Sequence, residues 1–132
     1  MGALSQAHSN NILDASLGTA SFVATTAPVR CRLMTANGSA TAAGTELATS
    51  GGYTSGSGAP SVTFAAASAG SAASNSAVTV TNMPATTITG VEVWDSAGTP
   101  VRKWWGALSA SKTTNSGDTF TIASGSLTVA FP

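Results

Sequence analysis

Short runs in which apolar and polar residues alternate are the feature that most restricts the fold of this chain. In VRCRL at 29–33 and VTV at 78–80, every second side chain is apolar. Successive side chains of a β-strand point to opposite faces, so this period predicts strands with one buried face. Runs of this kind recur along the chain with Gly, Pro, Asn and Ser between them. They predict an all-β fold.

The predicted strands are short and numerous. They cover residues 29–36, 61–66, 77–81, 88–95, 101–108, 119–123 and 126–131. SAGTP at 96–100 joins two apolar-rich runs, which predicts a β-hairpin, and Ser124-Gly125 predicts a turn between the last two strands. This pattern favours a single antiparallel β-sandwich or jelly-roll-like domain over residues 28–132, with one short helix before it.

The N-terminal region carries the only helix signal. Ser9 or Asn10 is a suitable N-cap, and Gly18 a suitable end, which predicts a helix over 10–18. Residues 1–9 are too polar to pack alone and are expected to form an arm that reaches a neighbour. Two stretches rich in Gly, Ala, Ser and Thr, residues 37–60 and 65–76, are expected to be long loops that become ordered against a neighbour.

Composition points to a subunit of a larger assembly. More than half of the 132 residues are Ala, Ser, Thr or Gly, only 8% are charged, and the formal net charge is zero. Soluble proteins that work alone usually carry more surface charge, so these faces suit contact with neighbouring subunits. The two small basic clusters are too weak for nucleic-acid binding. With no secretory signal and no apolar run long enough for a membrane span, we expect synthesis in the cytoplasm.

The search for chemistry finds no catalytic, cofactor-binding or metal-binding set, so we expect neither enzymatic activity nor a cofactor. His8 is the only histidine and is expected to be solvated or at an interface. Glu92 and Asp95 are three apart on one strand and point to opposite faces, which does not suit an acid–base pair. Asp118 is expected to bond to the backbone of its turn, and Cys31 to be a small buried apolar residue.

The candidate interface residues are Trp94, Trp104, Trp105, Tyr53 and Arg102. The three tryptophans lie on the predicted hairpin. Trp104 and Trp105 are adjacent, so they must point to opposite faces of their strand. An outward Trp is a natural centre of a protein interface or a platform for a sugar ring, while burial of all of them is an equally good interpretation.

Ten short segments, in order along most of the chain, resemble a known family. They are NILD at 11–14, LMTA at 33–36, GTE at 44–46, GGY at 51–53, VTF at 62–64, SN at 74–75, VEVWD at 91–95, GAL at 106–108, NSGD at 115–118 and ASGSL at 123–127. Together they resemble small virion proteins of tailed phages, which often bear the label tail fibre protein. The resemblance implies a virion structural protein and no catalytic motif.

Three functions remain open on this basis. The first is a capsid decoration or cement protein on the outer shell, whose partners would be the major capsid protein and copies of itself, arranged as a trimer or another cyclic oligomer. The second is a fibre, tip or baseplate subunit that binds other tail proteins. The third, from a different class, is a carbohydrate-binding module that uses an exposed tryptophan.

Overall fold

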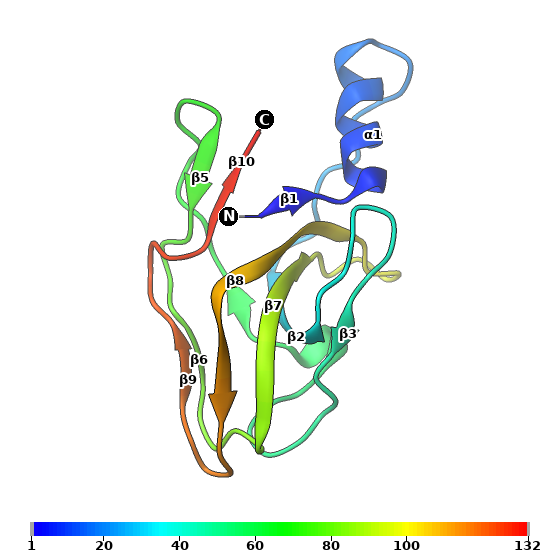
Figure 1. The fold of residues 1–132 in the computed structure, drawn as a ribbon. Helices are drawn as coiled ribbons and strands as arrows, with labels where there is room; N and C mark the ends of the chain where they lie inside the picture. The colour runs from blue at the N-terminus through cyan, green and yellow to red at the C-terminus, as the bar shows by residue number, and fades with distance from the viewer. Residues whose placement is uncertain (1, 132) are drawn as a thin grey trace.

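A computed structural model describes residues 2–131 and confirms the all-β prediction with a single N-terminal helix (Figure 1). Met1 and Pro132, at the ends of the predicted ranges, lie outside the described residues. The elements in chain order are β1 Ala3–Leu4, α1 Gln6–Ser16, β2 Val29–Ala36, β3 Thr45–Glu46, the 3-10 turn η1 Gly56–Gly58, β4 Ser61–Val62, β5 Ser71–Ala73, β6 Val78–Val80, β7 Thr86–Trp94, β8 Arg102–Thr114, β9 Phe120–Ile122 and β10 Thr128–Ala130.

The main layer is an antiparallel sheet in the order β1-β8-β7-β2-β3, with β4 beside the start of β2. Its centre is the predicted hairpin of β7 and β8, and β2 has the bounds that the alternation predicts. The pairing of β7 with β8 jumps from Gly90–Ala107 to Ile88–Lys112. Residues 108–111 therefore bulge out of β8, and extra residues of this kind bend a strand away from its partner.

The second layer is a narrow two-stranded ribbon. β6 pairs with β9, and β5 pairs with β10, so residues 71–80 run antiparallel to residues 120–130. The turn predicted at Ser124-Gly125 is present, but the expectation that the strands on either side pair with each other is wrong, because each finds a partner far away in the chain. Between the two ladders, the buried Ser74 Oγ accepts hydrogen bonds from the N–H groups of Gly125 (3.2 Å) and Leu127 (3.3 Å). The sandwich is therefore incomplete, with a ribbon in place of a second sheet.

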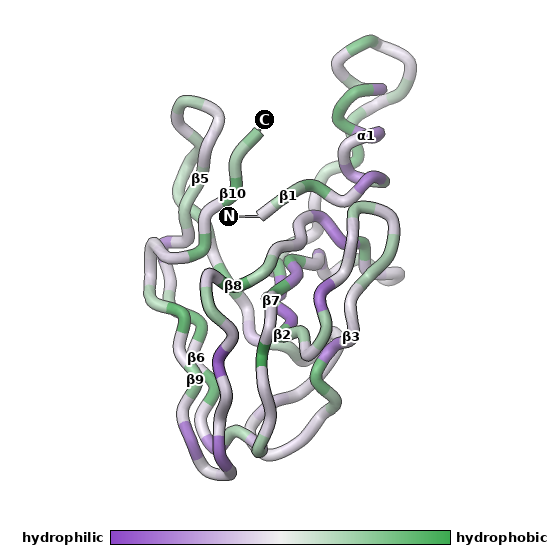
Figure 2. Tube along the Cα trace, viewed as in Figure 1, coloured by the Kyte–Doolittle hydropathy of each residue, from purple (hydrophilic) through white to green (hydrophobic). Residues whose placement is uncertain are grey.

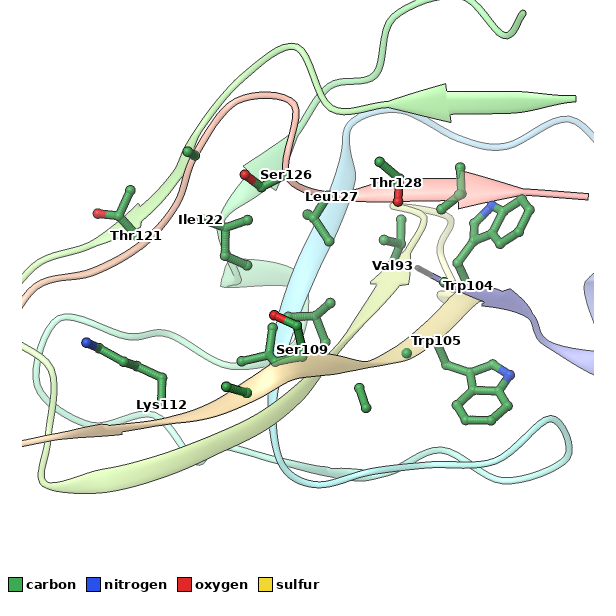
Figure 3. Close-up of a pocket in the computed structure, with 18 of the residues that line it drawn as sticks. Val93, Trp104, Trp105, Ser109, Lys112, Thr121, Ile122, Ser126, Leu127 and Thr128 are labelled. Atoms are coloured by element: carbon green, nitrogen blue, oxygen red, sulfur yellow. The ribbon is translucent and has the colours of Figure 1, made fainter. Parts of the chain in front are cut away.

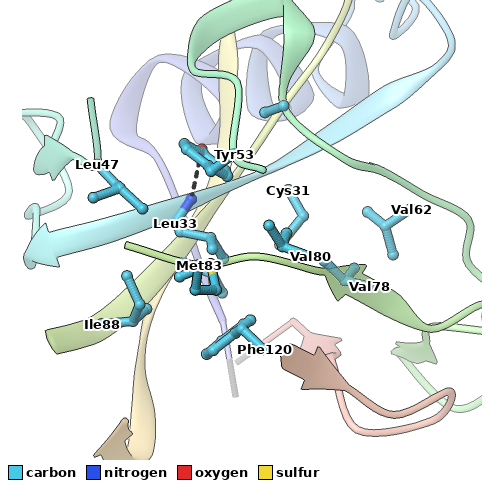
Figure 4. Close-up of a cluster of buried hydrophobic side chains, with 12 residues drawn as sticks. Cys31, Leu33, Leu47, Tyr53, Val62, Val78, Val80, Met83, Ile88 and Phe120 are labelled. Carbon is cyan, nitrogen blue, oxygen red and sulfur yellow. Dashed lines mark hydrogen bonds between the residues drawn. The ribbon is translucent and has the colours of Figure 1, made fainter. Parts of the chain in front are cut away.

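The core lies between the ribbon and one face of the main sheet (Figure 4). Cys31, Leu33 and Ile88 are fully buried there at 0% exposure, and Val80 and Phe120 of the ribbon pack against them. The burial of Cys31 that the alternation predicts is confirmed. Arg32 lies between Cys31 and Leu33 on β2 and so points to the opposite face, and its register partner Glu92 on β7 points the same way. This opposite face is polar in spite of being covered.

The N-terminus differs from its predicted form. Ala3–Leu4 adds a strand to β8 of the same chain, so these residues are not an arm that extends to a neighbour. The helix begins at Gln6 rather than at residue 10, because Ser5 is the N-cap and accepts from the His8 N–H at 3.3 Å. The predicted left-handed end is present, with Gly18 at φ +72.

The stretches expected to be long loops are folded onto the body of the same chain. Leu47, Tyr53 and Ala59 are buried members of the core cluster, so residues 37–60 supply one of its walls. Within residues 65–76, β5 pairs with β10 and Ser74 is buried. Neither stretch needs a neighbouring chain for its order.

Candidate functional site

The polar face of the main sheet holds a buried ion pair. Arg102 Nη1 donates to Glu92 Oε1 at 3.0 Å, and the two side chains are 8% and 1% exposed. Arg102 also donates to the carbonyl oxygens of Ala40 and Ala42, while Glu92 accepts from Trp94 Nε1 and from the Gly44 N–H. A buried charge is tolerated only when it is paired and hydrogen-bonded, and this arrangement meets both conditions. Its effect is to fix residues 40–44 on the sheet.

A second cluster lies beside it on the same face. The Arg32 guanidinium lies 4.1 Å from the centroid of the Trp94 ring, and its Nη1 is 3.6 Å from Glu46 Oε2. Glu46 accepts from the Tyr53 hydroxyl at 2.7 Å, and that hydroxyl accepts from the Leu33 N–H of β2 at 3.1 Å. The cluster therefore ties the segment of Tyr53 to the middle of the sheet.

A third cluster joins the helix to the end of the hairpin. Lys103 Nζ lies 3.4 Å from Asp95 Oδ2, and both side chains are buried. His8 is buried as well, which corrects the expectation of a solvated residue. Burial lowers the pKa of His8, the nearby Lys103 lowers it further, and Asp95 opposes them in part. Its Nδ1 has no hydrogen-bond partner among the described residues, so a proton there would lack an acceptor.

These clusters leave the surface almost without charge. The three ion pairs use six of the ten charged side chains, and Arg30 donates to the Ala59 carbonyl at 3.1 Å. The remaining three, Asp14, Lys112 and Asp118, are exposed. Asp118 accepts from the Asn115 N–H at 2.8 Å, which confirms its predicted role in the turn. Contacts on such a surface must depend on apolar groups, hydroxyl groups and the main chain.

The predicted interface residues occupy different places. Tyr53 and Arg102 are buried and bonded within the chain, so they belong to the interior and are not available to a partner. Trp94, Trp104 and Trp105 are partly buried. Trp104 and Trp105 lie on opposite sides of β8 (Figure 3), as their adjacency predicts. The use of the tryptophans in an interface stays a prediction.

A groove of about 490 Å³ separates the bulged half of β8 from the ribbon (Figure 3). We call it the interlayer groove. Its apolar lining comes from four elements or their flanks: Val93 of β7, Trp104 and Leu108 of β8, Ile122 of β9, and Leu127 and Val129 around β10. Gly2 is also part of the lining, and its N–H donates to the Thr128 carbonyl at 2.9 Å. Lys112 lies at the wall and is its only charged residue.

The size and lining of the interlayer groove suit an apolar segment or ligand. Its volume falls within the roughly 300–1,000 Å³ range of small-molecule pockets, whose walls are mostly apolar. The groove cannot be predicted from the sequence, because its walls come from residues that meet only through long-range pairing.

The titratable side chains outside the ion pairs bear on the chemistry that this surface could support. These residues contain no group of three or more His, Cys, Asp or Glu that could hold a metal ion. Burial raises the pKa of the Cys31 thiol to about 12, so the thiolate that would act as a nucleophile is not formed at neutral pH. The buried carboxylates are bound by cations and N–H groups within the chain. Within the described part of the chain, no helix is both long enough and apolar enough to span a membrane.

Comparison with known proteins identifies a matching family. The family model described as podophage GP4 fiber I protein gp80 matches residues 3–130, which is nearly the whole chain. No curated protein matches the chain.

Proposed function

The chain belongs to the podophage GP4 fiber I protein gp80 family, and from this premise we propose that it is a non-enzymatic structural subunit of a fibre on a phage virion. Membership over residues 3–130 is the observation that carries the proposal, because the family is described as a fiber protein. The resemblance to small virion proteins in the sequence points to the same class.

The distribution of charge supports a role in an assembly. Charged side chains are used to hold loops on the sheet, and the exposed surface is made mostly of small and hydroxyl-bearing residues. Subunits that pack against one another need to remove water from their contacts, and an uncharged surface lowers that cost.

The second candidate function is capsid decoration, which the sequence alone favours over a tail component. The observation that favours it is shape: residues 2–131 form one two-layer domain with a projecting helix and no extended stalk (Figure 1). A domain of this form can cover a shell in many copies as readily as it can sit on a fibre. Its partners would then be the major capsid protein and copies of itself, whereas a fibre subunit would bind other tail proteins.

The two candidates predict different copy numbers. We would measure copies per purified virion by quantitative mass spectrometry against the major capsid protein. A small number of copies, with antibody labelling at the tail, is the expected result for a fibre subunit. A ratio near one copy per capsid subunit, with labelling over the shell, would replace the fibre with decoration. Absence from purified virions would overturn both.

A carbohydrate-binding function has weaker support. The Arg32 guanidinium covers a face of the Trp94 ring, and Trp105 Nε1 donates to the Leu4 carbonyl at 3.2 Å. Neither arrangement resembles a free, flat platform for a sugar. Titration of glycans with tryptophan fluorescence as the signal tests this alternative, and a saturable change would restore it.

A further inference from the structure

Exposed apolar side chains lie on the helix and on the loop that runs back along it, where the Phe22 ring is 6.5 Å from the ring of His8. Leu13, Leu17, Phe22 and Val23 are 57%, 69%, 54% and 61% exposed, and we call these four residues the α1 tip. The helix and the loop after it stand away from the sheets, with apolar colour at their outer end (Figure 2). The tip includes four of the six large hydrophobic residues that are exposed in the described chain. Concentrated apolar exposure of this kind marks an interaction site.

The α1 tip has a fixed shape. Asn11 Oδ1 accepts from the Val23 N–H at 3.2 Å, which holds the returning loop against the helix. Thr19 Oγ1 bonds to the carbonyl oxygen and to Oδ1 of Asp14, both at 3.1 Å. The turn between them uses Gly18 in the left-handed region. A partner would therefore meet a preformed surface and would lose little conformational freedom in ordering it.

The interlayer groove is the complementary feature on another part of the molecule. The tip lies on the helix and the loop beside it, which stand away from the sheets, whereas the groove lies between β8 and the ribbon (Figure 1), so a tip cannot enter the groove of its own chain. The groove has the apolar lining and the volume that several apolar side chains require.

The few exposed charges favour this pairing. Asp14, beside Leu13 on the helix, is the only charged residue of the helix and its following loop, and Lys112 is the only one lining the groove. Both are exposed, and neither forms an ion pair within residues 2–131. A tip with one negative charge and a groove with one positive charge attract each other, while two tips repel.

We propose that the α1 tip of one copy docks in the interlayer groove of a second copy. The contact is head-to-tail, so it leaves a free groove on one copy and a free tip on the other. Such a contact closes into a ring or extends as a filament, according to the rotation between copies. The inference goes beyond the proposed function, because it applies equally to a fibre subunit and to a decoration protein.

The first experiment measures self-association of the full chain by sedimentation velocity over a concentration series. The native chain should associate, and Phe22→Ser should raise the apparent Kd about tenfold or more, as expected for a central aromatic contact. The matched control is Val101→Ser, which removes a 37% exposed apolar residue outside both surfaces and should leave association unchanged. A native chain that stays monomeric throughout, or a Phe22→Ser variant that associates normally, overturns the proposal.

The second experiment tests the head-to-tail arrangement. Asp14→Lys and Lys112→Asp should each weaken association severalfold, and the double variant should recover it, because the attraction is restored with reversed signs. A mixture of Phe22→Ser, which lacks a tip, with Ala123→Arg, which obstructs the groove wall, should form dimers and nothing larger. Failure of the double variant to recover, or failure of the mixture to form dimers, would contradict the contact. Circular dichroism shows whether each variant folds, and the copy number per virion tests the proposed function independently. Misfolding and failure of the proposed function can therefore each be distinguished from failure of this contact.

Discussion

At the scale of single residues, charge serves the interior of this protein. Glu92 has three donors within the chain, from Arg102, Trp94 and the Gly44 N–H. Paired and hydrogen-bonded in this way, a buried carboxylate holds a loop in one position. The same residues could have formed a charged surface, but the fold turns them inward.

Loss of the Arg102 cation should be severe. Arg102→Met leaves Glu92 buried without its counter-charge, so we expect the free energy of unfolding to fall by about 3–5 kcal/mol. Urea unfolding followed by tryptophan fluorescence measures the change. The control is Lys112→Met, which removes an exposed cation and should change the free energy by no more than about 0.5 kcal/mol. Equal effects of the two variants would show that the buried pair does not hold the fold.

His8 should make stability depend on pH below neutrality. Its folded pKa lies below the ordinary 6.5, because burial and Lys103 disfavour the charged form. The unfolded chain therefore binds more protons between the two pKa values. The stability that the neutral His8 contributes is full above pH 6.5 and is lost as the pH falls through the folded pKa.

The measurement is the free energy of unfolding at intervals from pH 7.5 to pH 5. His8→Gln keeps a polar side chain that does not titrate, so its stability should vary less over this range than that of the native chain. Identical pH profiles for the native chain and His8→Gln would contradict this role of His8.

Asp95 affects stability in a more acidic pH range than His8. Burial tends to raise its pKa, but hydrogen bonds from Val101 and Ala97 and the charge of Lys103 outweigh it and lower the pKa below 3.8.

At the scale of elements, close backbone contacts decide how the segments between strands are placed. A Cβ on Gly52 would lie 1.9 Å from the Thr81 carbonyl oxygen, and the Gly52 N–H donates to the Asn82 carbonyl at 2.8 Å. The GGY at 51–53 thus lets the chain pass against residues 81–82 and bring Tyr53 into the core. Only glycine permits that approach.

Gly52→Ala should therefore disturb the packing of this whole segment. We expect a loss of about 1–3 kcal/mol, since the obstructing atom is backbone and cannot rotate away. Scanning calorimetry should show a Tm lower by several degrees. Gly98→Ala is the matched control, because a Cβ there meets nothing within 4 Å. An unchanged Tm for Gly52→Ala would mean that the segment can move without cost.

At the scale of the whole molecule, the uncharged surface selects the kind of partner. Among residues 2–131, Lys112 is the only basic residue that is fully exposed, whereas Arg30 and Arg32 are half-buried and Arg102 and Lys103 are buried. Nucleic-acid binding draws on clusters of exposed cations that displace counterions from phosphates. This surface offers no such cluster among residues 2–131.

We therefore expect no binding to duplex DNA at low salt. Fluorescence anisotropy of a labelled duplex, titrated with the purified protein, measures this directly. The comparison is a variant with added surface cations, such as Ala110→Lys with Ser111→Lys beside Lys112. Saturable binding by the native chain that weakens as salt is added would contradict the expectation.

The strands were predictable where their pattern is local. The alternation around Cys31 gave the bounds of β2, and the connection at 96–100 gave the central hairpin, because both depend on neighbours in sequence. The helix was placed too late, since Ser5 is a less obvious cap than Ser9. Its preference for Ser5 follows from contacts with β8, where Ser5 Oγ donates to the Arg102 carbonyl at 2.6 Å.

The sequence by itself determined the all-β class, the buried thiol and the opposed tryptophans, because residue type and a spacing of two are sufficient for each. Tertiary structure alone decided that β9 and β10 pair with β6 and β5, that Tyr53 and Arg102 lie inside, and that an apolar tip and an apolar groove are both left open. The physical reason lies in the small residues. Ala, Ser, Thr and Gly have weak local preferences, so the partners of the segments they form are chosen by long-range packing.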